Sequence, residues 1–91
     1  MDGDTDLEAL AEREGWQRED ETARVHYRGE TEQYSIEFYA AVEVVLYWRV
    51  LEAGERAVPV DRGSVPPPLR ERIRNDLAEA GIDPDVEGIQ V

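Results

Sequence analysis

The one concentration of basic side chains in this sequence is at residues 70–74, with Arg56 and Arg62 upstream. Arg70 and Arg74 are four residues apart, so on a helix they would lie on one side, where two guanidinium groups could bind a phosphate or a carboxylate. The alternative is a solvent-exposed helix face, on which Arg72 pairs with Asp76 at the same spacing and each ion pair contributes at most about 0.5 kcal/mol. We expect the solvent-exposed face and keep anion binding as the alternative.

The single histidine is the only imidazole available for acid–base chemistry. His26 alternates with Arg24 and Arg28, but catalysis would also need a nucleophile or a carboxylate within reach, and the spacing identifies none. Ser35 and Ser64 are the only serines, and neither stands in a Gly-x-Ser-x-Gly elbow. We therefore predict no catalytic, cofactor-binding or metal-binding residues, and treat His26 as a surface or interface residue that remains a site candidate.

Two acidic segments begin like a calcium-binding loop. The first has aspartates at alternate positions: Asp2, Asp4 and Asp6. Leu7 stands where that loop requires glycine, however, and Arg13 stands where it requires the closing glutamate. The segment 83–88 fits better at its start, but the sequence stops at Val91, before the twelfth position of the loop. We expect no specific calcium site at either place.

The 91 residues include 22 acids and ten basic residues, all ten of them arginine, for a net charge of −12. This length predicts one small domain over residues 1–91, with residues 1–4 and 83–91 as candidate flexible ends. The absence of cysteine excludes disulfides and thiolate metal sites. The negative charge argues against nucleic-acid and membrane partners, and the acidic start with no long apolar stretch predicts a soluble, cytoplasmic protein.

Three elements are predicted before the apolar centre of the chain. Thr5 fits a capping box, so a first helix is expected over residues 6–14, ended by Gly15. The acidic run 19–21 is typical of an exposed turn. Thr22–Arg28 alternates between apolar and polar side chains, which predicts a half-buried strand.

The segment 34–51 is dense in apolar residues, and every even position from 34 to 50 is apolar. One strand of this length would be too long for a small domain, so we divide it at Ala40 and Ala41 into strands over residues 32–39 and 42–52. One long helix is the alternative, which the content of Val, Tyr and Trp disfavours. Residues 56–60 form a fourth strand, which Pro59 restricts to an edge of the sheet.

A second helix is predicted over residues 68–80 and ends at Gly81. The tail that follows, residues 82–91, could pack on the domain or fray. The fold class is therefore α+β in two layers, a four-stranded antiparallel meander with a helix at each end of the chain. Because neither side of the central strand is plainly polar, either the two helices cover different faces of the sheet or a second copy covers one face.

The composition and one segment carry a resemblance. The absence of lysine, the acidic amino terminus and the sequence VPPPLRERIRNDLAEAGIDPDVE resemble small, acidic, uncharacterised proteins of haloarchaea, a domain of unknown function. The resemblance implies a cytoplasm with molar salt, in which dense carboxylates keep a protein surface hydrated. It implies no activity and assigns no functional residue.

Two classes of function follow from the sequence. The first is a protein–protein interaction or regulatory module, which as a homodimer would bind a second copy of itself. Its candidate contact residues are the aromatic and basic side chains that usually anchor interfaces: Tyr39, Tyr47, Trp48, Arg70 and Arg74. The second is a small ligand-binding or catalytic domain with its site between the sheet and the second helix, using His26 or the two arginines. The missing catalytic motifs favour the first class.

Overall fold

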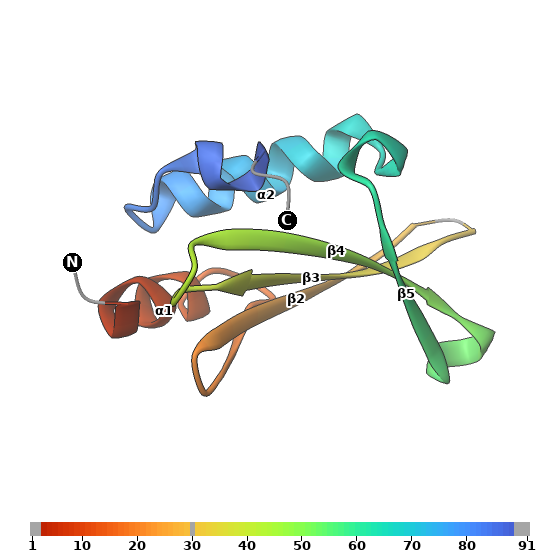
Figure 1. Ribbon diagram of the computed structural model, residues 1–91, viewed down its shortest axis with the longest axis horizontal. Coiled ribbons are helices and arrows are strands. Elements are labelled where there is room, and N and C mark those ends of the chain that lie inside the picture. The colour runs from red at the N-terminus through yellow and green to blue at the C-terminus, as the bar shows by residue number, and fades with distance from the viewer. Residues whose placement is uncertain (1–2, 30, 89–91) are drawn as a thin grey trace.

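The computed structural model describes residues 3–29 and 31–88 (Figure 1). The predicted strand at residues 22–28 and the apolar segment 34–51 form the centre of one antiparallel sheet. The strands follow one another in sheet order as a meander. Five strands make up the sheet: β1 (Gln17–Glu19), β2 (Thr22–Arg28), β3 (Gln33–Tyr39), β4 (Val44–Leu51) and β5 (Arg56–Val60). Two α-helices and three short 3-10 helices complete the fold: α1 (Gly3–Ala11), α2 (Pro67–Glu79), η1 (Glu52–Gly54), η2 (Arg62–Ser64) and η3 (Pro84–Gly88).

The expected α+β class is confirmed, but the expected number of strands is wrong. The additional strand, β1, pairs with the first half of β2 through Gln17–Glu19, and a tight turn at Asp20 and Glu21 joins the two. Asp20 has a φ of 54°, which places it in the left-handed region that Asp tolerates better than most residues. The sequence does not predict β1, because its three polar residues show no alternation of apolar and polar side chains.

The long apolar run divides where expected. Residues 40–43 form the turn between β3 and β4, and Val42 is exposed there. The predicted strand 42–52 therefore starts two residues later, at Val44. Pro59 lies on β5, an edge of the sheet, as a residue without an N–H donor requires.

Both helices are displaced toward the amino terminus relative to the prediction. α1 begins at Gly3 and ends at Ala11, so Thr5 lies inside the helix and does not cap it. Asp4 and Asp6 lie in the first turn, where carboxylates stabilise the positive end of the helix dipole. α2 begins one residue earlier than predicted. The N–H groups of a helix's first turn have no partner within the helix, so proline, which lacks an N–H, fits there.

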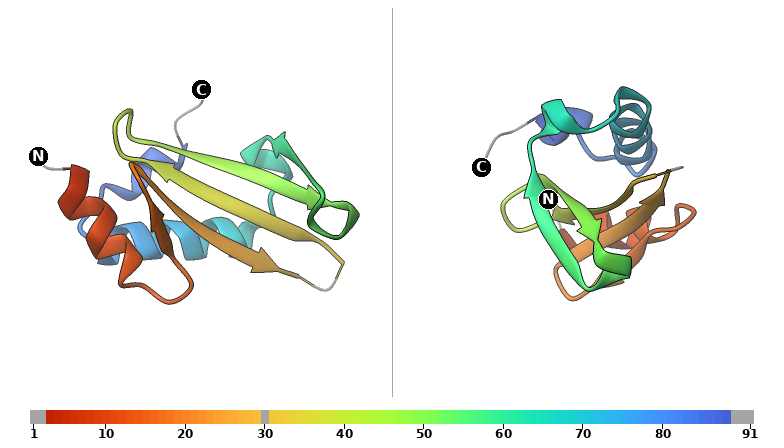
Figure 2. Two further views of the ribbon diagram at one scale, coloured as in Figure 1. Left: turned by 90° about the horizontal axis from the view of Figure 1, so that it is seen from below. Right: turned by 90° about the vertical axis from the view of Figure 1, so that its right-hand side faces the viewer.

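Both helices pack on the same face of the sheet. Leu7 and Leu10 of α1 and the buried side chains of α2 belong to one core with Ile36 and Phe38 of β3. The first alternative, helices on different faces, is therefore wrong. Figures 1 and 2 show α2 running along the sheet, with η3 beside it.

The tail packs on the domain over its described part. Ile82 and Val86 are buried in the core, and η3 contacts α2 and β4. Residues 3 and 4 lie in α1. The remaining candidate flexible residues, 1–2 and 89–91, lie outside the described residues.

Candidate functional site

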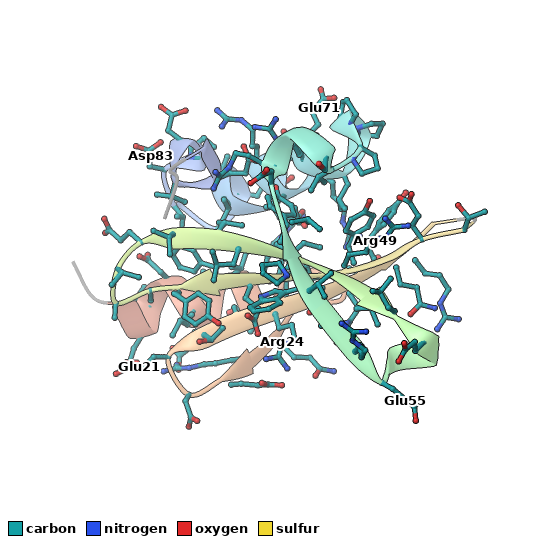
Figure 3. All side chains as sticks on the ribbon, turned by 45° about the vertical axis from the view of Figure 1, so that its right-hand side comes forward. Glu21, Arg24, Arg49, Glu55, Glu71 and Asp83 are labelled. Atoms are coloured by element: carbon teal, nitrogen blue, oxygen red, sulfur yellow. The ribbon has the colours of Figure 1, made fainter. Side chains whose placement is uncertain are left out.

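The face of the sheet opposite the helices is the first candidate surface, and we name it the open face. The strand register places alternate residues of each strand on it. Its side chains are Gln17, Glu19, Thr22, Arg24, His26, Arg28, Gln33, Ser35, Glu37, Tyr39, Val44, Leu46, Trp48, Val50, Ala57 and Pro59. Figure 3 shows Arg24 on this side of the sheet and Glu71 of α2 on the other.

A buried glutamate organises the centre of the open face. Glu37 is only 7% exposed, and its Oε1 accepts hydrogen bonds from the Tyr39 hydroxyl at 2.7 Å and from Nε1 of Trp48 at 2.8 Å. Its Oε2 accepts Nε of Arg24 at 2.9 Å and also contacts a terminal nitrogen of that guanidinium. Three strands are thereby joined through one carboxylate.

These contacts keep Glu37 ionised. Burial alone would raise its pKa, but the hydrogen bonds from Tyr39 and Arg24, the charge of Arg24 and the bond from Trp48 outweigh burial and hold the pKa below its usual range. The hydrogen bond to Glu37 in turn raises the pKa of Tyr39. A carboxylate that already accepts four contacts and does not readily protonate is unsuited to general acid–base catalysis, so its role is to fix the side chains around it.

A hollow of about 780 Å³ lies over the same face. Its lining combines the aromatic side chains of Tyr39 and Trp48 with polar residues that include His26 and Arg28. His26 lies directly opposite Ser35 in the register of β2 and β3, but no hydrogen bond joins the two among the described residues. The pair therefore lacks the contact that would activate a serine nucleophile.

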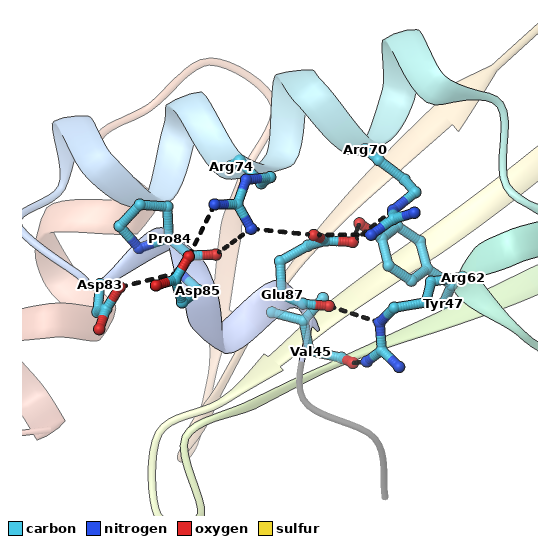
Figure 4. A network of polar contacts seen from close by, with 9 residues as sticks. All are labelled: Val45, Tyr47, Arg62, Arg70, Arg74, Asp83, Pro84, Asp85 and Glu87. Atoms are coloured by element: carbon cyan, nitrogen blue, oxygen red, sulfur yellow. Dashed lines mark hydrogen bonds and ion pairs between the residues drawn. The ribbon is translucent and has the colours of Figure 1, made fainter.

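The two arginines of α2 surround a second buried carboxylate (Figure 4). Glu87 of η3 is fully buried, and its Oε2 accepts Nε of Arg70 at 2.8 Å and the Tyr47 hydroxyl at 3.0 Å. Arg74 reaches Oε1 of Glu87 at 3.4 Å and pairs with Asp85 at 2.8 Å. The expected solvent-exposed face is therefore wrong in part: Arg72 does pair with Asp76 at 3.5 Å as predicted, but the partly exposed Arg70 and Arg74 bind a buried carboxylate.

The arginines do bind a carboxylate, as the alternative required, but it belongs to the same chain. Nε of Arg62 also donates to the backbone carbonyl of Glu87 at 2.6 Å. Burial would raise the pKa of Glu87, whereas the hydrogen bonds from Arg70 and Tyr47 and the charge of Arg70 lower it, and the pKa lies below its usual range. Burial, together with the charge of Glu87 and its hydrogen bond, raises the pKa of Tyr47 far above its usual value. This cluster fastens η3 to α2 and β4.

Described aspartates of both acidic segments are bonded within the chain. Asp4 contacts Arg18, and Asp2 lies outside the described residues. Asp83 accepts the backbone N–H of Asp85 at 2.9 Å, and Asp85 pairs with Arg74. Within residues 3–29 and 31–88, no group of three or more His, Cys, Asp or Glu side chains is arranged to hold a metal ion. The same residues contain no helix with the length and apolar content needed to cross a lipid bilayer.

A family model matches residues 7–89, which span nearly the whole domain, including the sheet, α2 and both buried glutamates. The chain belongs to the family of unknown function DUF7538. No curated protein and no solved structure matches it.

In this DUF7538 protein, the predicted contact residues divide between the two faces. Tyr39 and Trp48 lie on the open face, whereas Tyr47, Arg70 and Arg74 bind Glu87 on the helix side. His26 lies on the open face and not between the sheet and α2, whereas Arg70 and Arg74 lie on the helix side and bind Glu87.

The sequence reasoning missed Glu37 and Glu87 as organising residues. Glu37 carried one signal, because it interrupts the densest apolar run of the chain at a position where its neighbours are buried. Glu87 carried none, since it stands among other acids in a short tail.

Proposed function

We propose that this DUF7538 protein is a protein–protein interaction module that forms a homodimer through the open face. The observation that carries the proposal is the placement of both helices on one side of the sheet, which leaves the other side without a helix among the described residues. Among the described strand residues, that side carries two arginines and two glutamates, Arg24, Arg28, Glu19 and Glu37, in a chain of net charge −12. It is therefore formally neutral on a strongly acidic molecule.

The open face has the composition of a contact surface. Leu46, Trp48 and Val50 of β4 are only partly buried, and Pro59 of β5 is exposed beside them. Burying an apolar side chain completely contributes about 1.5–3 kcal/mol, and aromatic residues are enriched at interface centres. Because Glu37 holds the indole of Trp48 in place, a partner would lose little entropy in ordering that ring.

A second copy is the occupant that the charges favour. Two molecules of charge −12 repel each other over most of their surfaces, and the formally neutral face is where they can meet without opposing carboxylates. Two such faces would pack like the layers of a β-sandwich, about 10 Å apart. Association costs about 4–15 kcal/mol, and these side chains are already partly buried, so we expect a reversible dimer.

The same proposal assigns the protein to a salt-rich cytoplasm of haloarchaeal type. The absence of lysine and the excess of 12 acids over arginines support it, since molar salt shortens the Debye length to about 3 Å and screens the repulsion between copies. Salt should therefore strengthen the dimer, whereas an interface held by ion pairs would weaken.

Sedimentation velocity in 0.15, 1 and 3 M KCl tests the dimer. We expect a monomer of 10.4 kDa at the lowest salt and an increasing fraction of twice that mass as salt rises. Ala57→Arg places a charge on the exposed part of the open face and should abolish the dimer, whereas Ala78→Arg makes the same change on an exposed site of α2 and should not. A monomer in 3 M KCl at 1 mM protein, or equal effects of the two variants, would refute the proposal.

A second function, the binding of a small molecule, is favoured by the hollow itself. Its volume of about 780 Å³ is within the range of ligand sites. Arg28 and Trp48 would suit a carboxylate on a flat apolar body. Thermal-shift measurements with aromatic carboxylates in 0.15 M KCl, where we expect the chain to be monomeric, test this function, and a ligand shift that Arg28→Glu removes would support it.

A further inference from the structure

Three stretches of the sheet edge have no described strand beside them: the outer side of β5, the outer side of the three-residue β1, and the part of β2 that β1 does not cover. At one side β5 is the edge strand, and Pro59 interrupts its hydrogen-bonding capacity. At the other side β1 pairs only with Thr22, Ala23 and Arg24, so β2 continues beyond it as the outer strand (Figure 2, left). Of these stretches, we consider the second half of β2.

The hydrogen bonds that bracket the β2–β3 hairpin show which groups point outward. The N–H of Gly29 donates to the carbonyl of Glu32 at 2.7 Å, and the N–H of Ala40 donates to the carbonyl of Glu21 at 3.3 Å. Opposed residues of an antiparallel pair alternate between bonded and non-bonded positions, so the odd-numbered residues of β2 bond to β3. The even-numbered residues turn their N–H and C=O groups away from β3. Beyond β1 these are His26 and Arg28.

Within the described part of the chain, the side chains of the same two residues also have no partner. His26 and Arg28 are exposed, and neither forms a hydrogen bond or an ion pair with any described residue. The neighbouring Arg24, by contrast, binds both Glu37 and Glu19. In a chain with 22 acids, an arginine that no described acid neutralises is a local exception.

We propose that this free edge of β2 binds an extended, carboxylate-bearing segment of a partner protein, which adds to the sheet as a further strand in line with β1. The backbone of the segment would bond to the N–H and C=O groups of His26 and Arg28, the mode called β-augmentation. A carboxylate at an alternate position of the segment would lie beside the guanidinium of Arg28.

A second copy fits this edge less well than an acidic segment. Pairing of two β2 edges around a two-fold axis would bring the arginines and histidines of both copies together with no described carboxylate between them. The inference does not rest on the proposed dimer, because the backbone groups of the edge point along the plane of the sheet. The side chain of Arg28 does lie on the open face, so the two proposals share that residue.

Amide hydrogen exchange measured by NMR on the whole chain tests the proposal. The probe is an acetylated, amidated seven-residue peptide in which Glu alternates with Val, added up to 5 mM. KCl at 0.5 M limits long-range repulsion, because the Debye length is then about 4 Å, and leaves direct contacts effective. We expect exchange at the amides of His26 and Arg28 to slow at least tenfold, while amides of α2 stay unchanged.

Two charge reversals and one control peptide decide the role of the carboxylates. Arg28→Glu should weaken peptide binding at least fivefold, whereas Arg56→Glu, which makes the same change on exposed β5, should weaken it less than twofold. A peptide with Gln in place of Glu should bind wild type at least fivefold more weakly. Unchanged exchange at His26 and Arg28 overturns the proposal, and so do equal effects of the two reversals or equal binding of the two peptides.

Discussion

The indole of Trp48 donates its N–H to the carboxylate of Glu37 at 2.8 Å, across two neighbouring strands of the open face. In the β3–β4 register Glu37 lies opposite Leu46, so Trp48 is its diagonal neighbour on the same face. This bond fixes one edge of the ring and leaves the rest of the indole as an apolar surface on the open face. A buried polar group and an interface anchor are therefore parts of one arrangement.

Substitution of Glu37 by Gln should destabilise the fold. The variant removes the charge that Arg24 bonds to and weakens the contacts of Tyr39 and Trp48. Hydrogen bonds to charged groups contribute about 1.5–3 kcal/mol, so we expect the free energy of unfolding to fall by about 2 kcal/mol. Urea unfolding followed by tryptophan fluorescence measures it, with Glu71→Gln on the exposed side of α2 as the control. Equal stability of the two variants would show that Glu37 does not organise the face.

Substitution of Arg70 by Met should lower the free energy of unfolding by more than removal of any exposed ion pair does. Arg70 bonds Glu87, which is fully buried, and removal of one partner of a buried pair costs about 3 kcal/mol. Arg56→Met breaks only the exposed contact with Glu52, at 3.8 Å, and should cost less than about 0.5 kcal/mol. Urea unfolding compares the two variants. Amide exchange at Val86 should accelerate only in the first, and unchanged exchange there would argue against a fastening role for Glu87.

The pKa of Glu87 predicts a pH dependence of stability with a defined sign. Because the folded-state pKa is lowered, the contribution of Glu87 is fully present above its unfolded pKa, about 4.3, and is lost as the pH falls through the lower folded pKa. The difference in unfolding free energy between wild type and Glu87→Gln should therefore be constant above about pH 5.5 and shrink below about pH 4. Denaturation at pH 7, 5.5, 4 and 3 measures it. A difference that grows on acidification would contradict this sign.

The sequence predicts the parts of the fold whose residues repeat in a regular pattern. The alternation in β2 predicts a strand, because burial of one face requires the two-residue period. The low strand propensity at Ala40 predicts the turn between β3 and β4. β1 is not predicted, because its three polar residues adopt strand geometry only by pairing with β2. The start of α1 is missed because two valid helix signals compete, and the acids in its first turn prevail over the capping box.

The candidate site is less predictable from sequence than the fold, for a physical reason. Whether a carboxylate is exposed or buried depends on which arginines the tertiary structure brings to it, and Arg70 lies 17 residues from Glu87 in the chain. The four-residue spacing of Arg70 and Arg74 did identify them as a pair able to bind an anion. It could not reveal that the anion is a glutamate of the same chain, because a tail of ten residues has no period that orients it.

The stability of the fold should rise with salt. Self-repulsion of a chain at −12 opposes compaction, and screening at molar KCl removes most of it. We expect the midpoint of urea unfolding, followed by far-UV circular dichroism at pH 7, to be higher in 3 M than in 0.05 M KCl. A triple variant that replaces exposed acids by Gln, Glu12→Gln, Glu55→Gln and Glu71→Gln, lowers the net charge to −9 and should reduce the increment. Equal midpoints for wild type at the two salt concentrations would mean that the acidic surface is not an adaptation to salt, and would remove the main support for a salt-strengthened dimer.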